Sequence, residues 1–230
     1  MKIDTKFLFD YFKSRNHKFL YHANSVQTTS NFLMNNALLS RGNVERLNLN
    51  QTKQYTDKID KQYGIWYDIW LDTVDIHKRI NDRNKYGSVL LEFKIQILTM
   101  PQAGEWWITK LNPTHWSGKE VHEKWFQSEE EVEEGFKIGD FNHSLVFRHS
   151  GGQLNYQKKL KRIILDDPHM YYTEVYIDFF SLAYGALMVS MKDSDYICNI
   201  EKRKCYENCI CQKSWQKDNN GSIKSFIPIV

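Results

Sequence analysis

Apolar positions along the chain change between helical spacing and the alternation of extended strands. Apolar residues recur at helical spacing, several of them after a Ser cap, in segments 6–17, 25–39, 128–136 and 180–191. Short alternating or continuous apolar runs predict strands at 18–22, 65–70, 87–98, 144–149, 161–165, 171–180 and 223–230. Helices are concentrated early and strands late, without a regular βαβ rhythm. We therefore predict an α+β fold.

Length and chain organisation favour a single domain over residues 1–230. Two segments stand apart within it. Residues 101–126 hold four of the seven tryptophans and predict a long ordered loop, a kind of loop that is often functional. Residues 192–230 contain all four cysteines. We treat these as an insert and a C-terminal segment of the same domain.

Composition narrows the class of protein without naming a function. An apolar fraction of 41% with 14% aromatic residues excludes disorder as the main state. A net charge of +3 means that any nucleic-acid contact must come from a local basic patch. There is no apolar run of membrane-spanning length and no signal-peptide segment at the start, so we expect a cytoplasmic protein with no membrane partner.

The common catalytic motifs are missing from the sequence. It contains no Gly-x-Gly-x-x-Gly fingerprint, P-loop, His-Glu-x-x-His or Gly-x-Ser-x-Gly. Two other positions carry candidate chemistry. His22 is at the end of a predicted strand, before a capped helix, where its ring can bond a ligand hydroxyl. Glu174 lies within an aromatic strand, where burial raises the pKa of a carboxyl and suits it to proton transfer.

The order of these features resembles the ADP-ribosyltransferase fold, and within it the DarT-type toxins that modify nucleic-acid bases. The likeness spans roughly residues 19–180 as order and spacing: a His before a helix, an aromatic strand at 65–70, and a late strand with a Glu. It implies a split β-sheet core with flanking helices and NAD as a substrate. It also implies a His, an aromatic residue and a Glu on separate strands, which here are His22, Tyr67 and Glu174.

The resemblance assigns further roles. Asn24 follows the His, as polar residues do in the family, and either Arg41 or Arg46 is implied to hold the NAD pyrophosphate. The implied reaction breaks the nicotinamide–ribose bond through an oxocarbenium-like state that Glu174 stabilises. His22 positions the ribose and Tyr67 stacks on nicotinamide. The Trp-rich insert departs from the family pattern and leaves the target open among RNA, single-stranded DNA and protein.

Two groups of residues are candidates for binding the acceptor of the reaction. Basic residues flank the Gly151-Gly152 turn and suit a phosphate backbone: Arg148, Lys158, Lys159, Lys161 and Arg162. Tryptophans of the insert are suited to stacking on unpaired bases, or else to the core: Trp106, Trp107, Trp116 and Trp125. The resemblance further implies a toxin role in bacterial conflict or phage defence and a neutralising antitoxin protein.

Two alternatives remain open at the level of sequence. Glu92 and Lys94 form a Glu-x-Lys pair on a strong strand, as in Mg²⁺-dependent restriction-type nucleases. Asp72, Asp75 or Asp82 could supply the upstream acid. The chain could also be a non-catalytic nucleic-acid-binding protein on the same scaffold.

The cysteines form a compact C-x6-C-x3-C-x-C group: Cys198, Cys205, Cys209 and Cys211. Four thiolates can complete a tetrahedral zinc site. The group lacks the Cys-x-x-Cys pair of standard zinc fingers. Structural zinc and free, partly buried thiols both remain open.

Overall fold

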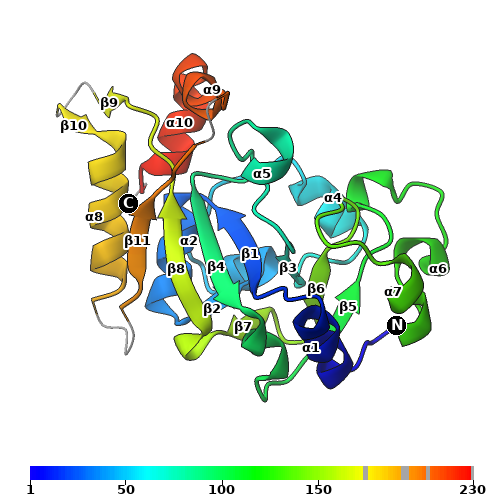
Figure 1. Ribbon diagram of the computed structural model, residues 1–230. Coiled ribbons are helices and arrows are strands. Elements are labelled where there is room, and N and C mark those ends of the chain that lie inside the picture. The colour runs from blue at the N-terminus through cyan, green and yellow to red at the C-terminus, as the bar shows by residue number, and fades with distance from the viewer. Residues whose placement is uncertain (173–175, 193–196, 206–207, 229–230) are drawn as a thin grey trace.

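The computed structural model describes residues 1–172, 176–192, 197–205 and 208–228 (Figure 1). Its helices are α1 Thr5–Ser14, α2 Val26–Met34, α3 Arg41–Arg46, α4 Asp57–Gln62, α5 His77–Ile80, α6 Val121–Lys124, α7 Glu129–Gly135, α8 Phe179–Ser190, α9 Cys211–Lys217 and α10 Asn219–Phe226. Its strands are β1 Phe19–Asn24, β2 Ala37–Leu39, β3 Ile69–Leu71, β4 Val89–Lys94, β5 Glu105–Ile108, β6 Leu145–Arg148, β7 Gln153–Asn155, β8 Leu160–Leu165, β9 Tyr171–Tyr172, β10 Ile177–Asp178 and β11 Asn199–Lys202. The predicted α+β class is confirmed.

Two sheets meet at one residue pair and then separate. The larger has the order β1-β4-β8-β11 and is antiparallel except for its parallel β8–β11 edge. The smaller is the antiparallel sheet β3-β6-β5, which lies beside it (Figure 1). Tyr21 and Asp72 join them by two backbone hydrogen bonds of 2.8 Å. We call this pair and the region where the sheets diverge from it the fork.

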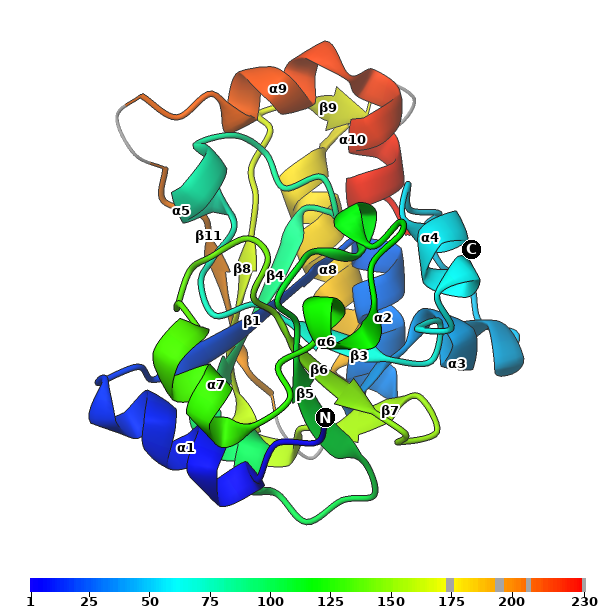
Figure 2. The ribbon, with the colours of Figure 1, turned by 90° about the vertical axis from the view of Figure 1, so that its right-hand side faces the viewer.

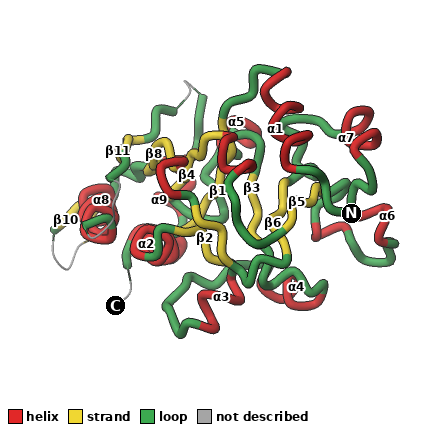
Figure 3. The backbone as a smooth tube through the Cα atoms, turned by 90° about the horizontal axis from the view of Figure 1, so that it is seen from below, coloured by secondary structure: helices red, strands yellow, loops and turns green. Residues whose placement is uncertain are grey.

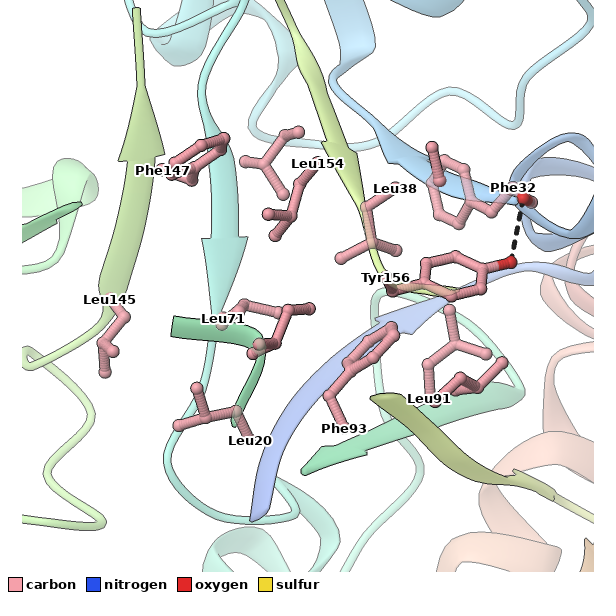
Figure 4. Close-up of a cluster of buried hydrophobic side chains, with 14 of the residues drawn as sticks. Leu20, Phe32, Leu38, Leu71, Leu91, Phe93, Leu145, Phe147, Leu154 and Tyr156 are labelled. Atoms are coloured by element: carbon pink, nitrogen blue, oxygen red, sulfur yellow. Dashed lines mark hydrogen bonds between the residues drawn. The ribbon is translucent and has the colours of Figure 1, made fainter. Parts of the chain in front are cut away.

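The core fills the space between the sheets and the helices that cover them. Helices α2 and α8 lie side by side against the larger sheet (Figure 3), and α8 buries one residue per turn, at Phe179, Ala183 and Leu187. Side chains from both sheets meet in the cluster of Figure 4, where the Tyr156 hydroxyl donates to the Phe32 carbonyl at 3.0 Å. Burial of this apolar surface is the main term that holds the fork in place.

Two elements differ from the sequence prediction because a local backbone feature ends a periodic pattern. The helix expected over 25–39 stops at Met34, since Asn36 takes a left-handed φ of 49° and Ala37–Leu39 forms β2, paired with β7. The strand expected over 87–98 ends at Lys94 and continues as the 3₁₀ turn Ile95–Thr99.

Two further expectations were wrong because tertiary contacts outweigh a weak local pattern. The insert 101–126 is not a loop throughout: Glu105–Ile108 forms β5, which pairs with β6. Of the final strand expected at 223–230, residues 223–226 belong to the helix α10, and residues 229–230 lie outside the described residues. Asp218 caps that helix by accepting from the Gly221 N–H, and Phe226 packs its ring on Trp215. The sequence pattern of α10 offers too few apolar positions to reveal this.

Gly87 fixes the end of β1 against the loop before β4. Its φ is +150°, and a Cβ atom there would lie 2.1 Å from the backbone carbon of Asn24. Only glycine allows this approach. The contact sets the position of Asn24, which matters for the cavity described next.

Candidate active site

A cavity opens at the fork, where β1 and β3 move apart. Its water-accessible volume is about 130 Å³, and the empty space between its walls, open mouth included, is about 950 Å³. Its floor comes from β1 and β3, and its sides from the start of α3, the loop before α4, and the α5 turn. Of the residues predicted from sequence, it brings together His22, Asn24 and Arg41.

His22 is oriented by a backbone carbonyl. Its Nδ1 lies 2.8 Å from the carbonyl oxygen of Trp70, which can only accept, so Nδ1 carries the proton. Burial lowers the pKa of His22, so that the ring is neutral near pH 7. Nε2 is then an acceptor, and it faces the Asn24 side-chain nitrogen at 3.5 Å. This tautomer gives the cavity a fixed acceptor atom.

Arg41 brings a guanidinium to the cavity, but that group is already engaged. It donates to both oxygens of Asp57, at 3.1 and 2.8 Å, and to the Thr52 carbonyl at 2.8 Å. Arg46, the alternative, is exposed and donates to Asn43, and it is not among the lining residues. Of the two arginines, Arg41 lines the cavity and Arg46 does not.

Tyr67 does not line the cavity, contrary to expectation. It is 48% exposed, and its ring lies over Gly42 and Gly152 outside the cavity wall. Four other aromatic residues line the cavity: Tyr21, Trp70, Tyr86 and Phe141. Tyr86 stacks on Tyr55 with ring centroids 5.8 Å apart. Nothing in the spacing of the sequence distinguishes these rings from ordinary core residues.

Glu174 lies outside the described residues. Its described neighbours Tyr171 and Tyr176 are both strongly exposed, and neither lines the cavity. Strands β9 and β10, on the two sides of Glu174, pair with each other. The role of Glu174 stays a prediction.

Three carboxylates that the transferase prediction did not use line the cavity, and one of them, Asp72, was a candidate acid of the nuclease alternative. Asp68 is bonded to Arg148, and Asp72 to Arg79. Asp60 has no such cation: burial first, and then the charge of Asp57, raises the pKa of Asp60 to about 6. A carboxyl group with a pKa close to neutrality is a candidate proton carrier.

Asp60→Asn tests the free-energy cost of holding an ionised carboxylate at position 60 in the folded protein. The folded state holds the Asp60 proton more tightly than the unfolded state, so wild-type stability falls as the pH rises from about 4 to about 6. The variant is expected to be more stable than wild type by about 1 to 3 kcal/mol above pH 6, and equal to it below pH 4. Urea denaturation across this range measures the difference. The exposed Asp10→Asn variant is the control, and a pH-independent difference for Asp60→Asn contradicts the assignment.

The predicted nucleic-acid surface does not form a single basic hairpin. Strands β6 and β7 belong to different sheets. Arg148 donates to Asp68 at 2.8 Å, and its guanidinium lies 4.7 Å from the ring centroids of both Trp107 and Trp125. Arg162 is bonded to Glu92 and Glu201. Of the five basic residues, the lysines Lys158, Lys159 and Lys161 remain as the candidates for phosphate contacts.

Three of the four tryptophans of the insert are part of the core rather than a stacking surface, and the fourth, Trp107, is partly buried against the cluster that contains Trp116 and Trp125. Trp106, Trp116 and Trp125 are at most 4% exposed. Trp116 and Trp125 pack with Ile65 and Val146 in a second hydrophobic cluster under the smaller sheet. Base stacking by these three rings is excluded by their burial.

The nuclease alternative is disfavoured by the surroundings of Glu92. Glu92 is 2% exposed, and both of its carboxylate oxygens accept from the Arg162 guanidinium, at 3.0 and 2.9 Å. Lys94 ends the same strand. A Mg²⁺ ion needs free carboxylate oxygens, which Glu92 does not offer here.

A second cluster of potential metal ligands includes His77, the first residue of α5. His77, Cys205, Cys209 and Cys211 place one ligand atom each within 4.8 Å of one another, a group that could hold a metal ion. Cys198 does not belong to it, contrary to the four-cysteine expectation. Cys198 is buried, and its thiol contacts the Met191 sulfur at 3.6 Å. The sequence prediction missed His77, because 132 residues separate it from Cys209.

Comparison with known proteins does not identify a family for this chain. No helix in the part of the chain that the structure describes is long and apolar enough to cross a membrane. No family model matches the chain, and no curated protein matches it at a significant level.

Proposed function

We propose that the chain is an NAD-dependent ADP-ribosyltransferase that uses the fork cavity and acts on a nucleic-acid base. One observation carries the proposal. His22 and Asn24, at the end of one strand, and Arg41, one of the two arginines that the resemblance implies, line one cavity between two diverging sheets. The split of the sheets is also what the resemblance implies. A toxin role, with an antitoxin that covers this cavity or reverses the modification, belongs to the same proposal.

In this proposal the cavity residues bind and orient NAD. The Nε2 atom of His22, an acceptor because the Trp70 carbonyl fixes the tautomer, accepts a hydrogen bond from a ribose hydroxyl in place of the Asn24 amide. The Asn24 amide lies beside it. The N–H groups of Arg41 that Asp57 and Thr52 leave unused face the pyrophosphate. An aromatic ring of the lining takes the stacking role that Tyr67 does not fill.

The transfer step is a substitution at the ribose carbon. The nicotinamide–ribose C–N bond breaks, and nicotinamide leaves with the bonding electron pair. A base nitrogen then forms the new C–N bond and gives up its proton to a carboxylate. Glu174 has this role in the proposal and also stabilises the positive charge that develops on the ribose.

His22→Ala tests the cavity. The assay uses labelled NAD with single-stranded DNA, RNA and a protein mixture as separate acceptors, in buffer without added Mg²⁺. We expect label on one nucleic acid with wild type and a loss of about ten-fold or more with the variant, mostly through weaker NAD binding. His122→Ala, on the exposed surface of α6, is the control.

Three results of this assay would count against the proposal. Wild type that labels none of the acceptors and binds no NAD contradicts it. Label confined to the protein acceptor contradicts the nucleic-acid target. Equal losses in His22→Ala and His122→Ala, with both variants folded by circular dichroism, contradict the site.

A further inference from the structure

We propose that His77, Cys205, Cys209 and Cys211 bind one Zn²⁺ ion in a closed, structural site. This site is separate from the fork cavity, and the inference does not depend on the proposed transferase function. It rests on the geometry of four side chains, on the orientation of His77, and on the two parts of the chain that the site would join.

The spacing of the ligand atoms fits a tetrahedral ion. The sulfurs of Cys205 and Cys211 are 3.2 Å apart, and the Cys209 sulfur is 3.1 Å from Nε2 of His77. Zinc bonds of about 2.3 Å to sulfur and 2.0 Å to nitrogen place neighbouring ligand atoms roughly 3.5 to 3.8 Å apart. These two distances are within about 0.6 Å of that spacing. All four atoms lie within 4.8 Å of one another, so shifts of up to about 1 Å would bring them around one ion. All four cysteines of the chain are free thiols, so no disulfide competes in this structure.

His77 is held in the form that binds a metal. Its Nδ1 lies 3.0 Å from the carbonyl oxygen of Asp82, which makes Nδ1 the donor and leaves the lone pair on Nε2. Nε2 is the atom that faces Cys209. A backbone carbonyl that fixes the far nitrogen is the usual support of a zinc-bound histidine. The Cys211 N–H donates to the Cys209 sulfur at 3.4 Å.

The donor set selects zinc among common ions. Three thiolates and one imidazole form a soft site, unlike the oxygen donors that Mg²⁺ and Ca²⁺ require. Four protein ligands leave no open position for water, as expected for a structural rather than a catalytic ion. His77 and Cys211 are almost fully buried, whereas Cys205 is exposed, so the ion has a route of entry.

The site would attach the C-terminal helices to the α5 turn. Helix α9 begins at Cys211 and lies above α5, beyond the loop that follows α5 (Figures 1 and 2). The Ile210 N–H already donates to the Asn81 carbonyl at the end of α5. The same turn carries Arg79, which lines the fork cavity and is bonded to Asp72. One short helix thus joins the metal cluster to the cavity wall.

The test is the metal content of the full-length protein, purified without a histidine tag from zinc-supplemented medium and measured by elemental analysis. We expect about one zinc per chain in wild type and in Cys198→Ser, and less than about a tenth in Cys209→Ser. Cys198 is the matched control because it is a buried cysteine of the same segment and lies outside the cluster. Exchange with Co²⁺ is expected to give thiolate-to-metal charge-transfer bands that Cys209→Ser lacks.

Wild-type protein alone can overturn the inference, so the outcome does not depend on a variant that folds. Wild type with less than a tenth of a zinc per chain, both as purified and after incubation with Zn²⁺ under reducing conditions, contradicts it. So does a full complement of zinc in Cys209→Ser. These outcomes leave the labelling assay untouched, because that assay does not read metal content.

Discussion

Arg203→Ala is expected to lower the free energy of unfolding by about 3 to 5 kcal/mol. The Arg203 side chain is 5% exposed and lies between two buried carboxylates. It donates to Asp75 at 2.6 Å and also to Asp166, which accepts a further bond from the Trp215 indole. Alanine leaves both carboxylates without their cation in a site that water does not reach, and this desolvation produces the loss of stability.

Urea denaturation measures this effect as a shift of the midpoint at constant slope. Lys119→Ala is the comparison, because it removes a cation from an exposed pair with Glu123 and should change stability by less than about 1 kcal/mol. If the two variants lose the same stability, Arg203 does not hold a buried charge network.

Glu174→Gln is expected to reduce ADP-ribose transfer by about 10²- to 10³-fold, while NAD binding stays within about three-fold of wild type. The amide keeps the size of the side chain and its bonds to a ribose hydroxyl, but not its charge. Only the transition state, where positive charge develops on the ribose, loses a partner. Single-turnover transfer and NAD titration by calorimetry separate the two quantities.

Asp60→Asn is the decisive comparison for Glu174→Gln. Asp60 is the cavity carboxyl whose pKa is raised toward neutrality. If Asp60→Asn removes transfer and Glu174→Gln retains it, the catalytic carboxylate is Asp60 and the assignment of Glu174 is wrong. Glu133→Gln, in an exposed ion pair with Arg15, serves as the neutral control.

Strong local patterns made part of this fold predictable. Ser25 and Ser128 each accept a backbone N–H at the helix start that they were expected to cap. Elements shaped by distant contacts were not predictable. Leu38 and Leu39 continue a helical spacing, yet they are a strand because β7 lies opposite them. Phe226 is helical because of Trp215 and Phe179, which one sequence cannot place beside it.

The candidate sites show the same division. His22 and Asn24 were found because they are close in sequence and share one strand end. Only the fold distinguishes Arg41, which lines the cavity, from Arg46, which does not, since both follow the same predicted helix. His77 and Asp60 carried no local signal: one is far from the cysteines along the chain, and the pKa of the other is raised by burial that depends on tertiary packing.

The order of strands in the larger sheet bears on how the chain emerges from the ribosome. Phe19 of β1 pairs with Lys94 of β4, so β1 is synthesised well before its partner. The next pairings, of β4 with β8 and of β8 with β11, which ends at Lys202, form only after still more of the chain has been made. At about 5 to 20 residues per second, β1 spends several seconds in the nascent chain without its partner. An unpaired strand edge invites association with other chains. Production of this protein should therefore depend strongly on chaperones that shield nascent chains, and on the speed of translation between residues 24 and 89.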